Sequence, residues 1–301
     1  MKLEVYIHEW ANLVLRWLHI IAGITWVGTS FFFMWLDSNL KSSADDDGHS
    51  GVGHLWLVHS GGFYKVNKYR MLPETVPDHL HWFKWEAYFT WLSGMALLVV
   101  IYYMGAEYFL INKQVADLGQ WMAAGAGLGF LAGGWLMYDL LCKTRVAKNN
   151  TVLAMLIMIL VLFSAYILTH IFSARGAFIH VGAMIGTVMA ANVFMVIIPA
   201  QKALLASVTD GLVPDKSLAM KAKLRSTHNN YATLPVLFIM ISNHYPLIYL
   251  HEFNWLILSA IVVITASVQH YFNLKHQGVC KPIILVASGI ATLLLALFAA
   301  T

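Results

Sequence analysis

Eight apolar segments, each close to the length needed to cross a bilayer, dominate this 301-residue sequence. An α-helix needs about 20 apolar residues to span roughly 30 Å of hydrocarbon. We therefore predict an all-α fold, a polytopic membrane bundle of eight transmembrane helices that forms a single integral membrane domain over residues 1–301. The predicted spans are residues 11–36, 87–108, 118–142, 151–172, 176–199, 231–250, 254–273 and 281–300.

The composition agrees with this class, because 59% of the residues are hydrophobic and only 11% are charged, whereas about a quarter are charged in soluble domains. The first apolar run, from Trp10 to Leu36, is longer than the core of a signal peptide and lacks a small-residue cleavage site. We expect it to be retained as the first helix. The two cysteines, Cys142 and Cys280, form no C-x-x-C-H motif, so no covalent c-type haem is expected in this chain.

The distribution of lysine and arginine predicts the orientation. Fifteen of the 19 Lys and Arg residues lie in the loops after the first, third, fifth and seventh predicted helices, and only three lie in loops on the other side. Cationic loops face the cytoplasm, which places the loops 37–86 and 200–230 there and both termini in the periplasm. We expect a multi-pass protein of a bacterial inner (plasma) membrane. The formal charge of +4 reflects this bias, and no nucleic-acid partner is expected.

The two long loops differ in character. In the first, a flexible acidic linker is followed by "LWLVHSGGFYKVNKYRMLP", whose aromatic alternation and glycines predict a short hairpin or interfacial segment. The second carries spaced cations and predicts a short helix on the membrane surface. Glycines at four-residue spacing predict close helix packing, and they are Gly125, Gly129, Gly133, Gly182 and Gly186.

Ionisable residues inside membrane helices are expensive and are functional candidates. With the orientation above, four histidines on four helices converge on the outer leaflet: His19, His170, His180 and His244. Neutral imidazoles from different helices suit a haem iron or another transition metal, and Arg16 and Arg175 suit haem propionates. A b-type haem is the candidate cofactor, whereas any single histidine is more often an interior hydrogen-bonded side chain.

A second polar layer faces the cytoplasm. Helical spacing puts His81, Lys84, Trp85 and Tyr88 on one stripe at the start of the second helix. The segment "RSTHNNY", residues 225–231, reaches the same side with a cation, a hydroxyl, an imidazole and two amides. Together they offer charge, hydrogen bonds and aromatic faces to a flat anionic heterocycle. An interfacial aromatic belt with a snorkelling lysine explains the first segment equally well.

Four segments carry a resemblance to a known family: "LRWLHIIAGITWVGTSFFFMWLD", "HLHWFKWEAYFTWLSG", "HVGAMIGTVMAANVFMVIIP" and "RSTHNNYATLPVLFIMISNHYP". They resemble the membrane domain of the PuuD-type, cytochrome c-coupled urate oxidases (urate hydroxylases). The resemblance implies oxidation of urate to 5-hydroxyisourate without reduction of oxygen to peroxide. It also implies a C-terminal cytochrome c, for which this chain has no C-x-x-C-H motif. Either a separate cytochrome c accepts the electrons, or the chain is a truncated or divergent member.

The hypothesis that follows has urate held by Lys84 and Arg225 with Trp85 against its face. His81 or His228, assisted by Thr227, removes a proton, and Asn229 or Asn230 holds the attacking water. The expected partners are urate, a cytochrome c and the lipid bilayer. Two alternatives remain open: a non-catalytic b-type cytochrome subunit that carries electrons, and a transporter of a small anionic metabolite.

Overall fold

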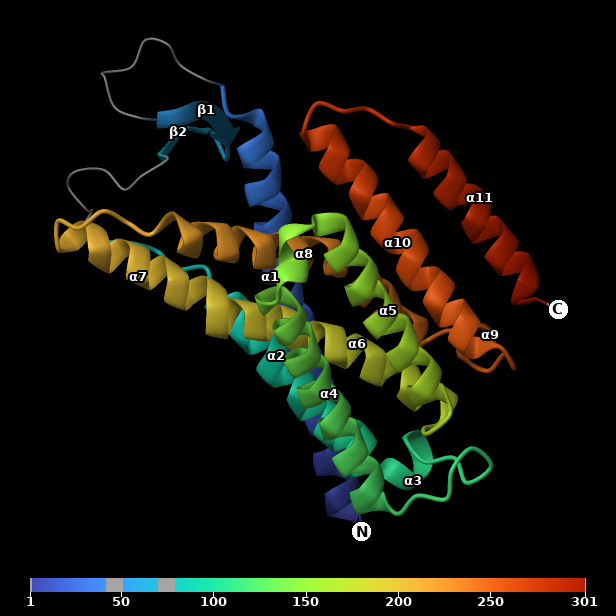
Figure 1. Cartoon of the computed structure of the whole chain (residues 1–301). Coiled ribbons are helices and arrows are strands. Elements are labelled where there is room, and N and C mark those ends of the chain that lie inside the picture. The colour runs from blue at the N-terminus through green and yellow to red at the C-terminus, as the bar shows by residue number, and fades with distance from the viewer. Residues whose placement is uncertain (1, 42–50, 70–78, 301) are drawn as a thin grey trace.

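The computed structural model describes residues 2–41, 51–69 and 79–300, which form a helical bundle with one small β-hairpin (Figure 1). The helices that form its body are α1 (Lys2–Asn39), α2 (Trp85–Leu97), α4 (Gln120–Lys143), α5 (Asn150–Thr169), α6 (Ala174–Ala191), α7 (Ile198–Thr209), α8 (Lys216–Ser242), α10 (Asn254–His276) and α11 (Ile283–Phe298). Shorter pieces are the π-helices η1 (Leu98–Tyr103) and η3 (Asn192–Ile197), the 3-10 turn η2 (Arg145–Lys148), α3 (Ala106–Phe109) and α9 (Pro246–Tyr249).

Six helical segments in these described ranges are long and apolar enough to cross a membrane, which is compatible with a multi-pass membrane protein. They are Val5–Asn39, Trp85–Tyr103, Gln120–Lys143, Asn150–Thr169, Ala174–Thr209 and Asn254–His276. The other two of the eight predicted spans are not confirmed. Residues 231–250 are interrupted, because α8 ends at Ser242 and α9 begins at Pro246. Helix α11 has 16 residues, or about 24 Å of helix.

The predicted hairpin is confirmed. Strands β1 (Gly51–His59) and β2 (Gly62–Tyr69) pair antiparallel across a two-residue turn. Ser60 and Gly61 both have positive φ, 50° and 77°, which is the backbone of the type I′ turn that matches strand twist. Backbone hydrogen bonds between Lys41 and His54, and a 2.6 Å ion pair between Lys68 and Asp37, attach the hairpin to the end of α1.

The predicted loop 200–230 is instead the meeting of two long helices. Helix α6 continues through η3 into α7, and only six residues separate the end of α7 from the start of α8. Asp215 is the N-cap of α8 and accepts hydrogen bonds from Ser217. Gly211, with φ +69°, lies in the turn between them. Figure 1 shows α7 and the first part of α8 extending together to one side, away from the rest of the bundle. The apolar pattern missed this because the first half of α8 is polar.

Helix α6 lies at the centre of the core, where Ala177, Phe178 and Val181 are fully buried. The glycines that permit close packing are mostly not the predicted ones. A Cβ at Gly127 would lie 2.6 Å from Nε2 of His180, and one at Gly134 would lie 2.5 Å from Met184. Of the predicted set, Gly182 closely approaches Ile239 of α8, whereas a Cβ at Gly125, Gly129, Gly133 or Gly186 would meet nothing within 4 Å.

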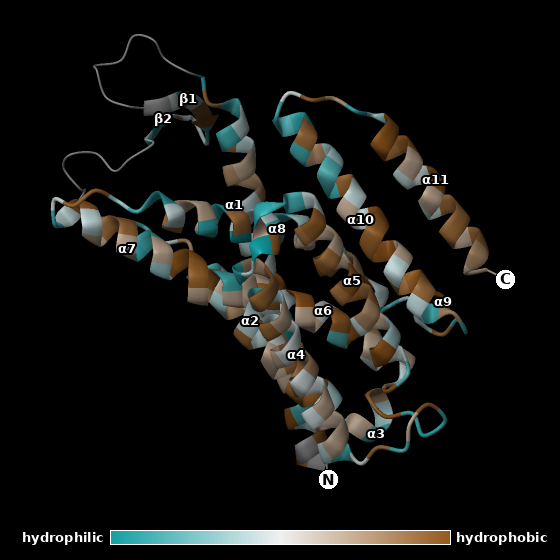
Figure 2. Cartoon of the chain, viewed as in Figure 1, coloured by the Kyte–Doolittle hydropathy of each residue, from teal (hydrophilic) through white to brown (hydrophobic). Residues whose placement is uncertain are grey.

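Hydrophobic residues line most of each helix, and hydrophilic residues gather at helix ends, including the end nearest the hairpin (Figure 2). At that end, helices α4, α8 and α10 bring polar side chains into the interior. Such side chains are costly unless they are hydrogen-bonded or paired. They are the starting point for locating a site.

Candidate functional site: a buried polar network beside an apolar cavity

A buried arginine anchors the polar network. Arg225 of α8 is only 4% exposed, and its Nη2 donates to Oδ1 of Asp139, on α4, at 2.6 Å. Lys143 approaches the other oxygen of Asp139 at 2.5 Å. The guanidinium also lies over the rings of Tyr138 and Trp135, 4.9 Å and 5.8 Å from their centroids. Two cations share one carboxylate, so the triad Arg225, Asp139 and Lys143 carries a formal net charge of +1 and favours an anion nearby.

Asn192, the first residue of η3, connects Arg225 of this triad to Tyr138 of α4 and to Asn229, one helical turn further along α8. Its Oδ1 accepts from Arg225 at 3.4 Å, and its Nδ2 donates to the hydroxyl of Tyr138 at 3.0 Å and to Oδ1 of Asn229 at 2.8 Å. Asn229 in turn donates to the carbonyl of Met189 at 2.9 Å. Single π-helical turns within α-helices are frequent at functional sites. Here the π turn places an amide between three helices.

Tyr138 and His228 form a hydrogen-bonded pair, with 2.8 Å between the tyrosine hydroxyl and Nδ1. That hydroxyl accepts from Asn192, and it can donate its own proton to Nδ1 of His228 when the imidazole carries its proton on Nε2. The thiol of Cys142 lies 4.0 Å from the same nitrogen. This arrangement can relay a proton from the tyrosine to the imidazole.

A second buried cluster joins α8 to α10. Gln269 is 1% exposed, and its Nε2 donates to Asn230 at 3.1 Å and to Asn273 at 3.3 Å, while Asn230 donates to the sulfur of Met34. Within the described residues, Oε1 of Gln269 is buried and has no hydrogen-bond partner. An orphaned buried acceptor requires an explanation. A water molecule or a bound N–H donor would satisfy it.

The predicted α8 residues divide between two faces of the helix. Arg225, His228, Asn229 and Asn230 contribute to the two clusters. Thr227 does not, because it is exposed and its hydroxyl donates to the carbonyl of Lys223.

The predicted α2 residues lie on the far side of η3. Tyr88 packs its ring against Phe194 of η3 at 5.5 Å. The other three predicted residues lie at or just before the start of α2. His81 packs on Phe83, Lys84 lies over the ring of Trp85, and Trp85 is 56% exposed. No hydrogen bond or ion pair recorded among the described residues joins the side chains of residues 79–88 to α8. The structure therefore does not bring the two predicted walls into direct contact, and η3 occupies the position between them.

Sequence reasoning missed Tyr138 and Asn192. The available signal was the amide in "AANVF", one polar side chain within a long apolar run. Tyr138 gave no such signal, since tyrosine is common in membrane helices.

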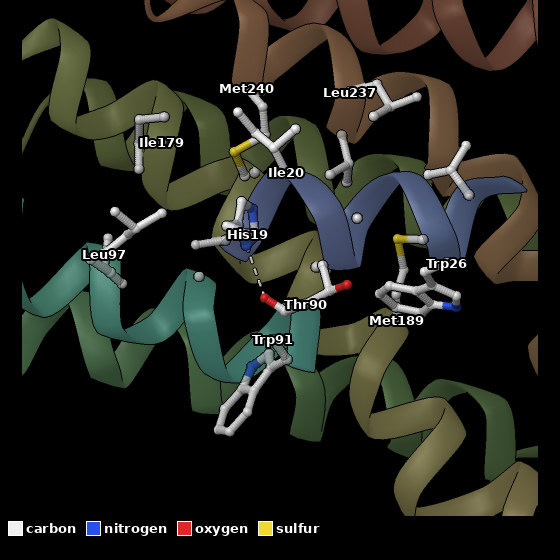
Figure 3. Close-up of a pocket in the computed structure, with 18 of the residues that line it drawn as sticks. His19, Ile20, Trp26, Thr90, Trp91, Leu97, Ile179, Met189, Leu237 and Met240 are labelled. Carbon is white, nitrogen blue, oxygen red and sulfur yellow. Dashed lines mark hydrogen bonds between the residues drawn. The ribbon is translucent and has the colours of Figure 1, made fainter. Parts of the chain in front are cut away.

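A cavity of about 680 Å³ lies between α1, α2, η1, α6 and α8 (Figure 3). Its wall is mainly apolar, and Asn229 is among its few polar residues at one end. Asn229 therefore belongs both to the polar network and to the cavity wall. The volume lies in the usual range for small-molecule and cofactor sites, about 300–1,000 Å³.

The four predicted outer histidines do not converge. His19 and His244 line the cavity, together with Arg16. His180 is fully buried elsewhere, with Nδ1 at 2.8 Å from the carbonyl of Gly176 and Nε2 at 3.3 Å from the hydroxyl of Tyr103. His170 is exposed and bonds to the carbonyl of Tyr166.

The second predicted propionate partner, Arg175, is not on the cavity wall. Its Nε donates at 2.5 Å to Oδ1 of Asn243, and Asn243 does line the cavity. Arg175 thus lies behind the end of the cavity that Asn243 and His244 line, and Arg16 is the arginine that faces the cavity.

Comparison with models of protein families matches residues 5–300 to the family described as urate oxidase N-terminal. The matched region contains both polar clusters and the whole cavity wall. A search of curated proteins and a search of solved structures each returned no match.

Proposed function

Since the chain belongs to the urate oxidase N-terminal family, we propose that it converts urate to 5-hydroxyisourate and passes the electrons to a cytochrome c rather than to oxygen. The balanced reaction is urate plus water to 5-hydroxyisourate, two protons and two electrons. Each electron reduces one ferric cytochrome c. The oxygen atom added to the substrate comes from water, so the reaction proceeds without dioxygen.

The observation that carries this proposal is the network of Arg225, Asn192, Tyr138, His228 and Asn229 at the end of the cavity. Urate is a flat anion with N–H donors and carbonyl acceptors around its edge. The net positive triad attracts its charge, and the amide of Asn229 faces its edge from the cavity wall. Charge-assisted hydrogen bonds of this kind are among the stronger ones in proteins.

The proton that leaves urate passes to the Tyr138 and His228 pair. Urate donates an N–H proton to the tyrosine hydroxyl as that hydroxyl donates its own proton to Nδ1 of His228. Removing the proton enriches the heterocycle in electrons and makes it easier to oxidise. General-base catalysis by a positioned histidine typically contributes about 10²- to 10⁴-fold to a rate. Asn229, the amide of the network that lines the cavity, is the group we assign to the attacking water.

This assignment keeps Arg225, His228 and Asn229 from the sequence-based hypothesis and replaces the α2 residues with Tyr138 and Asn192. It leaves out Asn230, which is bonded to Gln269 of α10. His81, Lys84 and Trp85, exposed or half-buried on the other side of η3, are left outside the reacting centre. The membrane orientation that we propose keeps the network on the cytoplasmic side. The cytochrome c would then act at the periplasmic side.

The test uses the detergent-purified full chain with urate and ferric cytochrome c under argon, in water enriched in ¹⁸O. We expect urate-dependent reduction of the cytochrome, with two cytochromes reduced per urate and the heavy oxygen in the product. Arg225→Ala and His228→Ala should each abolish most of this activity, whereas Ser226→Ala, an exposed neighbour on the same helix, should retain it. Reduction that needs dioxygen, or that survives in both variants, would contradict the proposal.

A further inference from the structure

His19 has the hydrogen bonding of a metal ligand. Its Nδ1 lies 3.0 Å from the carbonyl oxygen of Thr90 and 3.2 Å from the hydroxyl of Ser93, both on α2. A carbonyl oxygen only accepts, so Nδ1 carries the proton and Nε2 holds the free lone pair. Nε2 has no hydrogen-bond partner in the described part of the chain. Histidines that bind metals commonly donate their other N–H to a carbonyl in this way.

The backbone of α2 is shaped around this ring. A Cβ at Gly94 would lie 2.9 Å from Cε1 of His19 and 3.3 Å from Nδ1, so no larger residue fits there without displacing the imidazole. Figure 3 shows His19 projecting from α1, bonded to Thr90, with Ile179 of α6 and Met240 of α8 among the labelled residues of the facing helices. The imidazole is thus fixed in position on the wall of the cavity.

The cavity suits one large, flat, mainly apolar group. Most of its wall is apolar, and two of its glycines, Gly28 and Gly186, open onto free space where a Cβ would stand. Arg16 lies one helical turn before His19 and lines the same cavity. Within the described part of the chain, its one hydrogen bond is to Asn12 of its own helix, at 3.2 Å. A cation on that wall can pair with carboxylates on the edge of an otherwise apolar ligand.

We infer that the cavity binds a b-type haem, with Nε2 of His19 as an axial ligand of the iron and Arg16 paired with a haem propionate. His244 is the other histidine that lines the cavity and is the candidate for a second iron ligand. His180 cannot serve without rearrangement, because both of its nitrogens are bonded within the fold and Gly127 lies against Nε2. The exposed His170 does not line the cavity.

The location gives this haem a role, which rests on the function proposed above. Asn229 and Met240 both line the cavity and are 11 residues apart on α8, a separation of about 16 Å along the helix. A group in the cavity therefore bridges much of the roughly 30 Å hydrocarbon layer. A haem held by His19 and Arg16 would supply one-electron transfer between the urate site and an external cytochrome c. Two such transfers would account for both electrons from one urate.

The test needs no urate. Full-length chain in detergent is titrated with ferric protoporphyrin IX and followed by its visible spectrum and by electron paramagnetic resonance. We expect saturable binding of one haem per chain with a histidine-ligated iron. His19→Ala should weaken binding at least tenfold and remove the histidine-ligated signal, and added imidazole should restore that signal, which shows that the cavity of the variant is still folded. The matched control, His170→Ala, should bind haem as the unsubstituted chain does.

Absence of saturable binding to the unsubstituted chain would overturn the inference, as would unchanged ligation in His19→Ala. Tight binding of a ubiquinone analogue that excludes haem would overturn it in favour of a quinone site. Failure of urate oxidation is a separate result. A chain that binds haem through His19 but does not oxidise urate contradicts the proposed reaction and leaves the haem site standing.

Discussion

Tyr138 of α4 and His228 of α8, 90 positions apart in the sequence, are joined by a 2.8 Å hydrogen bond between the tyrosine hydroxyl and Nδ1. The same hydroxyl accepts from Asn192 of η3 at 3.0 Å. One hydroxyl therefore connects α4, α8 and η3 within the buried polar network. Removing it affects the proton path while leaving the packing of the aromatic ring in place.

Tyr138→Phe isolates that proton path. The ring, which lies under the guanidinium of Arg225, is kept, and only the hydroxyl is lost. We expect urate-dependent cytochrome reduction to fall by about 10²-fold, the lower range for loss of acid–base catalysis. The control is Tyr108→Phe, since Tyr108 is 84% exposed on α3. Equal activity in the two variants would remove Tyr138 from the mechanism.

Asp139→Asn tests the charge balance around Arg225. The substitution leaves a buried guanidinium without its carboxylate, and breaking such a pair typically costs about 3–5 kcal/mol of folding free energy. Asp37→Asn breaks the exposed ion pair with Lys68, and such pairs contribute about 0–1 kcal/mol. Unfolding in detergent, followed by intrinsic fluorescence, should therefore show a much larger loss for Asp139→Asn. Similar losses would mean that Arg225 is compensated elsewhere.

Two glycines one half-turn apart on α4 should respond with opposite signs. Gly127→Ala places a Cβ 2.6 Å from Nε2 of His180 and 2.7 Å from the hydroxyl of Tyr103, and overpacking of this kind costs about 1–3 kcal/mol. Gly129→Ala meets nothing within 4 Å and should gain up to about 1 kcal/mol from helix propensity. Thermal unfolding midpoints in detergent provide the comparison. A destabilised Gly129→Ala would indicate a tight contact at this face.

Hydropathy predicted most of the helices because the apolar windows follow directly from the thickness of a bilayer. It did not predict α8 as one helix, since its first half, Lys216 to Asn230, is polar and its second half contains Pro235. The hairpin was predictable from local turn chemistry at Ser60 and Gly61. The packing glycines were not, because four-residue spacing identifies a small-residue face but not whether another helix covers it.

The site was predictable only in part for a similar reason. Helical periodicity groups residues that share a face of one helix, as it did for His81, Lys84, Trp85 and Tyr88. It cannot show which helices meet, so the insertion of η3 between α2 and α8 was not foreseen. The predicted topology gave each histidine a depth in the membrane but not the direction in which its side chain points. Depth alone does not separate His19, on the cavity wall, from His180, enclosed in the core.

Arg225→Lys separates charge from geometry in the polar network. Lysine keeps the positive charge, but a single ammonium lacks the guanidinium fork with which Arg225 reaches both Asp139 and Asn192. Asn192 then loses a partner on Oδ1, and the amide that positions Tyr138 and Asn229 is less firmly held. We expect kcat/KM for urate to fall about tenfold, equivalent to about 1.4 kcal/mol, and to remain above that of Arg225→Ala. If Arg225→Lys retained full activity, charge alone would account for the role of this residue. If it fell to the level of Arg225→Ala, the bond to Asn192 would be the decisive contribution.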